Sequence, residues 1–484
     1  MNHRKAVRMS SAILAAVLIV WSTSCATNPV SQEREFMLLS QSDEIALGRQ
    51  TDPQILQTYG HYEDPQLAEY VGAIGSRMGA LSHRPELEYS FKVLDSPVVN
   101  AFAVPGGYVY LTRGILAYLN DEAELAGVIG HELGHISARH SAKQYSRAQA
   151  AQLGLGLGSI LSETFRQYAG LAQVGVSLLF LSFSRENERQ ADDLGVLYSS
   201  KAGYDANRMA NLFITLQRLN PSQGQDGLPA WFSTHPNPPD RINAIRQAAR
   251  QWQESNPQVQ LRTNRDQYLM HLEGLIIGED PRQGYVDGQM FYHPVLGFQF
   301  PIPAGWQVNN TPSQVQIFSQ AQDAVILLSA SGESTPAAAA DAFISGTQAM
   351  VVSSETRRVN GLPAERLVCD VATEQGLLRV LACFIQKDNL VYSFMGYTVQ
   401  ERFDGYLPAF DTTIGQFQNL TDAARINVRP QRLAVRKTSR EGNLRQSLQS
   451  YGVPQDKLET HAILNGMELD DPLPAGTLIK IVSR

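Results

Sequence analysis

The chain has 484 residues, which is too long for one compact hydrophobic core and predicts about two to four domains. A hydrophobic content of 43% and a charged content of 18% exclude an intrinsically disordered chain. The formal net charge of −7 and the lack of a sustained basic run argue against nucleic acid as the main partner.

Residues 1–24 predict an export signal, because an apolar stretch too short for a spanning helix follows three basic residues, Arg4, Lys5 and Arg8. The small residues before Cys25 resemble a bacterial lipobox, so we expect a lipid anchor at Cys25. Ser22 departs from the lipobox pattern, and the alternative is cleavage after Ala26 with a soluble product. The residue after the cysteine, Ala26, resembles that of enteric lipoproteins sorted to the outer membrane. The expected location is therefore the bacterial periplasm.

Two further cysteines, Cys369 and Cys383, lie in two apolar runs separated by a short turn. An even pair in an exported chain predicts a disulfide across a β-hairpin. The alternative is a pair of buried free thiols.

The segment before the main motif predicts a helix, a strand and a hairpin. Apolar residues at helical spacing predict a helix over 64–81, and residues 89–94 predict a strand. Residues 100–112 predict two short strands hinged at Pro105-Gly106-Gly107. Either a strand here is an exposed edge that pairs with an extended peptide, or the two strands form an ordinary internal hairpin.

A helix predicted over 122–145 carries the motif His131-Glu132-Leu133-Gly134-His135. Residues four apart share one face of a helix, so His131 and His135 can direct two imidazoles at one point. Glu132 lies on the same turn, beside the expected metal-bound water, and the pattern is typical of zinc peptidases. On such a helix His140 lies off the zinc face, and we expect it at the surface or behind a ligand.

A metzincin would carry a glycine and a third histidine at the positions of Ala138 and Ser141, so that subclass of zinc peptidase is excluded.

A second motif supplies the best third ligand. Glu188 and Asp192 are four residues apart and can face the same way, with Glu188 on the metal and Asp192 as a hydrogen-bond acceptor for a ligand imidazole. Glu163 is a rival third ligand. The alternative is a solvated acidic helix face, to which we assign Glu186 and Asp193.

Two segments near these motifs are less specific. The glycine-rich apolar stretch at 153–183 predicts a buried helix that closes the core, or a mobile helix over the active site. His235 lies in a proline-rich loop. Such a histidine is usually a surface residue, but next to a zinc site it can contact the oxyanion or cover the open metal position.

The C-terminal half carries no recognisable catalytic cluster. We expect a polar linker at 256–289 and an accessory α+β, sandwich-like domain at 290–422 with a helix over 337–350. Residues 430–484 predict a strand, two helices and a strand.

The motifs His131–His135, Glu188–Asp192 and His235 with Arg241 together resemble the zinc metallopeptidase family of the CAAX prenyl protease, HtpX and BepA type. The resemblance covers about 25–250, and its opening segments are similar to the lipoprotein members. It implies a mainly helical zincin domain over 25–255 with a small sheet and one Zn²⁺ per chain. It implies His131, His135 and Glu188 as ligands, Glu132 as general base, Asp192 as an orienting residue, and His235 and Arg241 near the transition state.

The tail at 430–484 resembles a degenerate LysM domain, which implies a weak contact with peptidoglycan. The expected function is a zinc-dependent metalloendopeptidase that cleaves unfolded or misassembled cell-envelope proteins in protein quality control. The alternative is a latent or inactive protease that acts as a periplasmic chaperone or a cell-wall-tethered binding protein.

Overall fold

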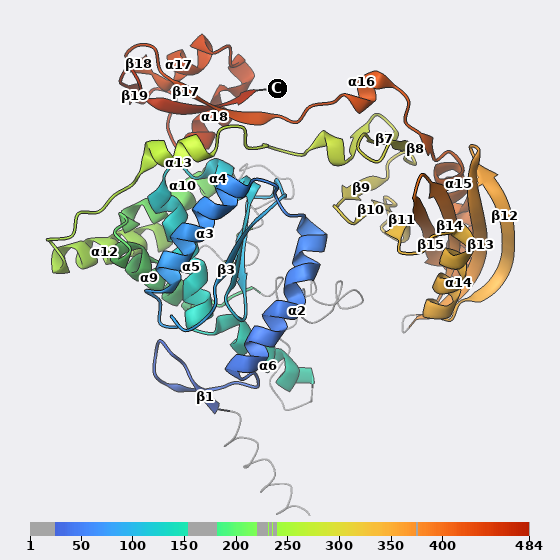
Figure 1. Cartoon of the computed structure of the whole chain (residues 1–484), viewed down its shortest axis with the longest axis horizontal. Helices are drawn as coiled ribbons and strands as arrows, with labels where there is room; N and C mark the ends of the chain where they lie inside the picture. The colour runs from blue at the N-terminus through green and yellow to red at the C-terminus, as the bar shows by residue number, and fades with distance from the viewer. Residues whose placement is uncertain are drawn as a thin grey trace, which may run out of the picture. The chain divides into compact units, whose positions relative to one another are not determined.

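The computed structural model describes residues 25–152, 182–219, 231, 235, 240–373 and 376–483. Its mixture of helices and sheets confirms the predicted α+β class. The described residues form two compact units (Figure 1), the first mainly from 25–278 and 432–483 and the second mainly from 279–431. Among the described helices, none is both long and apolar enough to cross a lipid bilayer.

The first unit begins with helices and short strands. Its strands are β1 (Cys25–Thr27), β2 (Arg34–Phe36), β3 (Ser90–Leu94), β4 (Ala101–Val104) and β5 (Tyr108–Thr112). Its helices up to residue 152 are α2 (Gln41–Tyr59), α3 (Pro65–Gly79), α4 (Arg113–Tyr118), α5 (Glu122–Ser137) and α6 (His140–Gln152). Those that follow are α9 (Arg185–Lys201), α10 (Met209–Leu219), α12 (Arg241–Ser255) and α13 (Arg265–His271).

A three-stranded sheet of order β3-β5-β4 packs against α3 and α5. The predicted hinge forms as expected, because Gly106 and Gly107 take φ values of 90° and 101° that favour glycine. Strand β4 is antiparallel to β5 and lies at the edge of this sheet among the described residues. It also packs on α5, so the edge runs beside the helix that carries the metal motif.

Helices α5 and α9 approach closely because glycines line their contact. A Cβ at Gly130 would lie 2.9 Å from the carbonyl oxygen of Gly195, and one at Gly134 would lie 3.0 Å from Ala191 Cα. These distances leave no room for a side chain. The close approach places the acidic residues of α9 beside the histidines of α5.

The helix that carries His131 and His135 differs from its prediction. A single helix is expected over 122–145, but α5 ends at Ser137 and α6 begins at His140. Between them Arg139 takes a left-handed conformation with φ 57°. Its guanidinium is held by Glu44, a residue of α2 far away in sequence, so the break depends on a tertiary contact.

Residues 432–483 complete the first unit. They form β17 (Arg432–Lys437), β18 (Gly442–Asn443), α17 (Leu444–Ser450), α18 (Leu458–Leu464), β19 (Pro472–Leu473) and β20 (Leu478–Ser483). We call this segment the C-terminal lobe. Its strands β17 and β20 pair antiparallel, and the lobe contacts α4, α10 and α13 (Figure 1). Part of the predicted linker is also core here, since Tyr268, Leu269 and Leu272 are buried.

The second unit is built on a seven-stranded sheet of order β12-β13-β14-β15-β11-β10-β9 and a four-stranded sheet of order β16-β8-β7-β6. The strands are β6 (Tyr285–Asp287), β7 (Met290–His293), β8 (Phe298–Pro301), β9 (Gln307–Asn310), β10 (Gln314–Phe318), β11 (Ala324–Ser331), β12 (Met350–Val359), β13 (Leu362–Thr373), β14 (Gly376–Lys387), β15 (Leu390–Val399) and β16 (Gln418–Asn419). The helices are α14 (Pro336–Thr347), α15 (Phe403–Gly415) and α16 (Ala423–Ile426).

The predicted disulfide is wrong, and Cys369 and Cys383 are buried free thiols. Cys369 on β13 lies opposite Val380 on β14, three residues from Cys383. Side chains alternate between the faces of a sheet, so an odd offset places the two thiols on opposite faces. They accordingly belong to different hydrophobic clusters.

Candidate metal centre

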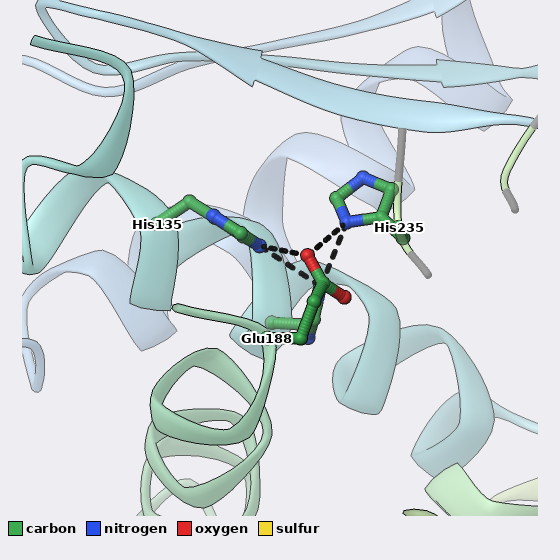
Figure 2. A group of neighbouring side chains, drawn as sticks. His135, Glu188 and His235 are labelled. Atoms are coloured by element: carbon green, nitrogen blue, oxygen red, sulfur yellow. Dashed lines mark hydrogen bonds and ion pairs between the residues drawn. The ribbon is translucent and has the colours of Figure 1, made fainter. Parts of the chain in front are cut away.

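Four buried side chains converge in the first unit: His131 and His135 from α5, Glu188 from α9, and His235. One nitrogen or oxygen of each lies within 4.8 Å of those of the other three. Figure 2 shows His135, Glu188 and His235 turned toward one another from separate parts of the chain. All three predicted ligands therefore meet, together with the loop histidine.

The spacing of these atoms suits a tetrahedral metal ion. His131 Nε2 lies 3.1 Å from His135 Nε2 and 3.2 Å from His235 Nδ1. Glu188 Oε1 lies 3.0 Å from His235 Nδ1 and 3.4 Å from His135 Nε2. A zinc ion with bonds of about 2.0–2.1 Å places its tetrahedral ligand atoms about 3.3–3.4 Å apart. The donor set and its dimensions therefore fit zinc.

The ionisation of these groups also suits a cation. Burial holds the pKa of His131 well below its ordinary value and lowers that of His135 to about 3, so both imidazoles are neutral at pH 7. Burial opposes the ionisation of Glu188, but the charge of His235 and the hydrogen bonds from His135 and His235 prevail. The pKa of Glu188 accordingly lies well below its usual range. Two neutral nitrogens and one carboxylate are common peptidase ligands.

Asp192 and Arg241 stand behind the cluster. Asp192 Oδ1 lies 3.0 Å from His131 Nδ1, and Arg241 holds the same carboxylate with two hydrogen bonds of 2.6 and 2.8 Å. Arg241 also lies 2.9 Å from Glu188 Oε2 and covers the ring of Phe213. These contacts orient one predicted ligand histidine and the predicted ligand carboxylate.

Glu132 lies on the other side of the cluster, near β4. Burial raises its pKa to about 7, while a backbone hydrogen bond from Ala103 on β4 acts in the opposite direction. Its Oε1 lies 3.8 Å from His235 Nε2, and among the described residues neither atom has a hydrogen-bond partner. Glu132 Oε1 and His235 Nε2 are therefore the two polar atoms of this site that a bound water or substrate group would satisfy.

His235 is more deeply buried than a loop histidine usually is. Trp231 stacks on its ring with centroids 4.5 Å apart, and Phe183 lies 5.5 Å away. Burial opposes protonation of His235, but the charge of Glu188 outweighs it and raises the pKa of the imidazole. The motifs in the sequence do not predict that Trp231 and Phe183 contact the site. The one sequence feature that could have indicated Trp231 is its position four residues before His235.

Other predicted residues lie elsewhere. Glu186 has an exposed side chain that contacts Arg189, as expected for a solvated helix face. The rival ligand Glu163 and nearly all of 153–183 lie outside the described residues. His140 contacts His135 through the ring nitrogen that faces away from the cluster, which agrees with the second of its two predicted places, behind a ligand.

Comparison with known proteins agrees with this site. The model of peptidase family M48 matches residues 65–249, which include every residue of the cluster. The beta-barrel assembly-enhancing protease of Yersinia pestis is 31% identical over 223 residues, covering 44% of this chain and 45% of that protein. The mitochondrial metalloendopeptidase OMA1 of Schizosaccharomyces pombe is 31% identical over 243 residues, covering 49% of this chain and 70% of that protein.

The chain spans less than half the length of the bacterial relatives that it matches. The matched region nevertheless contains the histidine motif, the acidic motif and His235 with Arg241 in one continuous alignment to the family model. The chain therefore belongs to peptidase family M48.

Proposed function

We propose that this protein is a zinc-dependent metalloendopeptidase. The observation that carries the proposal is the convergence of His131, His135 and Glu188 on one buried point, with the Glu132 carboxylate beside it. When bound there, one Zn²⁺ per chain supplies an activated water and polarises the scissile carbonyl. A complete set of these groups disfavours the alternative of an inactive binding protein.

The chain's own residues have distinct roles in this proposal. Glu132 takes a proton from the attacking water and returns it to the leaving amine. Asp192 fixes the ring of His131, and Arg241 holds Asp192 and Glu188 in place. With its guanidinium engaged in this way, Arg241 acts by orientation, and His235 is left as the group that faces the oxyanion.

His235 has a second proposed role. Its Nδ1 lies 3.0–3.2 Å from Glu188 and His131, at the corner that a water or substrate needs. In this arrangement the site is latent, and His235 moves aside for substrate to enter. Crystallising the zinc-loaded protein with and without a peptide inhibitor tests this, because His235 should leave the metal only in the inhibitor complex.

The edge strand β4 is proposed to bind the substrate. It lies at the edge of its sheet, and its Ala103 is next to Glu132. An extended polypeptide paired with β4 would carry a peptide bond across the catalytic carboxylate. This mode recognises unfolded chains by backbone hydrogen bonds, which supports unfolded or misassembled envelope proteins as the substrate class.

Four further proposals concern the location of the protein and the nature of its domains. The export signal and the segment at Cys25 support a lipoprotein of the bacterial periplasm, anchored to the outer membrane. The first unit is proposed to be a zincin domain, and the second a sandwich-like accessory domain. The strand-helix-helix-strand order of the C-terminal lobe supports a LysM-like fold with weak peptidoglycan contact.

The decisive test is casein hydrolysis by purified protein and by Glu132→Gln, with zinc measured in both. We expect one zinc per chain in each protein and a rate about 100- to 10,000-fold lower in the variant. Equal rates, or a rate that a chelator leaves unchanged, would refute the peptidase. For the anchor, Cys25→Ser should release the protein from membranes, and an unchanged fractionation would contradict lipidation.

A further inference from the structure

The residue after the break in the metal helix lies directly behind a proposed ligand. Because α5 stops and Arg139 turns left-handed, the ring of His140 folds back toward α5. His140 Nδ1 lies 3.1 Å from His135 Nδ1, on the side of His135 away from the cluster. His140 is buried, and its Nε2 lies 3.0 Å from Gln190 Oε1 on α9.

The break is held by a buried ion cluster. Glu44 binds Arg139 through one oxygen and Arg84 through the other, the latter at 2.7 Å. Arg139 also donates to Leu39 O at 2.7 Å, and Arg84 to Ile136 O at 3.2 Å. A left-handed non-glycine residue is strained and persists only where its surroundings impose it. The buried ion cluster therefore stabilises the turn that places His140 against His135.

The orientation of the Gln190 amide sets which nitrogens carry hydrogen. With Oε1 facing His140, this atom can only accept, so His140 Nε2 is the donor and His140 Nδ1 keeps its lone pair. His135 Nδ1 must then donate to His140, which leaves the lone pair of His135 Nε2 directed at Glu188 and His131. The opposite tautomer of His140 would place a hydrogen on the ligand side of His135 and prevent metal binding.

We propose that His140 and Gln190 are positioning residues that hold His135 in its metal-binding tautomer. They are the uncharged counterpart of Asp192 and Arg241, which support His131 with a carboxylate. This inference rests on the proposed zinc site. It goes further by giving a role to two residues that are neither zinc ligands nor catalytic groups. Of these, Gln190 provides the acceptor that sets the chain of hydrogen bonds.

Gln190 offers the sharper test because it is only half-buried, so its substitution leaves the core intact. Gln190→Glu keeps an acceptor, Gln190→Met removes it, and Gln190→Lys presents only donors. We expect zinc affinity, measured by competition with a chromophoric chelator, to fall about 10- to 100-fold in the methionine and lysine variants. It should be retained in the glutamate variant. Saturating zinc should restore kcat in Gln190→Met.

A charge control separates acceptor geometry from electrostatics. Arg189→Gln changes the net charge by the same amount as Gln190→Glu, at an exposed neighbouring position. It should leave zinc affinity unchanged. Zinc affinity that follows net charge across these variants, and not the presence of an acceptor, would overturn the proposal.

Substitution of His140 provides a second series. His140→Leu should weaken zinc binding about 10- to 100-fold, and His140→Asn should recover most of it through its side-chain oxygen. His461→Leu is the matched control, since His461 is also buried but lies in the C-terminal lobe. If wild-type protein binds no zinc, the proposed function fails. If it binds zinc and cleaves casein while all Gln190 variants match it in affinity, only this inference fails.

Discussion

Residues 279–431 and the C-terminal lobe adjoin each other in sequence, yet they obtain their hydrophobic cores in different ways. Residues 279–431 build their own core around Phe291, Phe298, Phe300, Ile326 and Phe394. The lobe has a small core of its own on one face of β17 and β20. The other face, with Leu433 and Leu478, joins the core of the metal-binding unit. Proximity in sequence therefore says little about which segment supports the catalytic site.

Polar contacts strengthen the same difference. Lys480 of the lobe is buried and donates to Ala117 O and Leu119 O at 2.6 and 2.8 Å, at the end of α4. Arg218 on α10 donates to Met467 O at 2.8 Å. Residues 279–431 are instead an insertion whose ends meet, because Ile276 pairs with Arg432 across the gap. The lobe thus belongs to the first unit, and the insertion forms a unit of its own.

Deletion gives the largest expected effect. Ending the chain after Gln431 should leave the first unit unfolded. The unit would lose core side chains such as Leu433 and Leu478 and the two hydrogen bonds that Lys480 donates at the end of α4. Replacing 279–431 with a short Gly-Ser linker should preserve folding and casein hydrolysis. For each deletion variant, circular dichroism measures folding and casein hydrolysis measures activity. Equal tolerance of the two deletions would remove the distinction drawn between the segments.

Core truncations should separate the units at the level of single residues. Leu464→Ala, in the lobe, and Phe394→Ala, in the insertion, should each lower the unfolding free energy of their own unit by about 2–5 kcal/mol. Only Leu464→Ala should lower the temperature at which casein hydrolysis is lost. If Phe394→Ala lowered that temperature as much as Leu464→Ala does, the two units would unfold together.

Metal removal should act on one unit alone. Zinc held at about 100 times its dissociation constant stabilises a folded site by about 3 kcal/mol. A chelator should therefore lower the unfolding temperature of the first unit, measured by calorimetry, and leave that of the second unchanged. Glu188→Gln should remove the response to the chelator, whereas a response that persists would place the metal elsewhere.

Because of Lys480, the stability of the contact between the C-terminal lobe and α4 should depend on pH. Burial lowers its pKa from 10.5 to about 7 in the folded chain, so between these values only the unfolded chain carries the extra proton. Stability should then rise with pH across this window, by at most about 1.4 kcal/mol per pH unit. The difference in unfolding free energy between wild type and Lys480→Met isolates this slope. The exposed Lys457→Met is the control, and equal slopes in all three proteins would contradict the assignment.

The smallest effect is expected at the cysteines of the insertion. Both thiols are buried on opposite faces of one sheet, and burial raises the pKa of Cys369 to about 11 and of Cys383 to about 12. A reducing agent should therefore leave the unfolding temperature of the second unit unchanged. A clear decrease would reveal a disulfide that this fold does not permit.

Local patterns in the sequence determine much of this protein by themselves. The spacing of His131 and His135, the pair of Glu188 and Asp192, and the glycines at 106 and 107 each depend on a few neighbouring residues. Helix and turn geometry then limits where those side chains can point. The α+β class and most strands beside the motif are predictable for the same reason.

Tertiary structure alone decides the rest. The break before His140 requires Glu44, which lies 95 residues from Arg139, and no local pattern marks it. The faces of Cys369 and Cys383 depend on the pairing register of β13 and β14. The attachment of the C-terminal lobe depends on which face of β17 packs on the hydrophobic core of the first unit. Each of these features depends on which of several distant segments a residue packs or pairs with. Local sequence patterns do not determine which of these long-range contacts is the most stable.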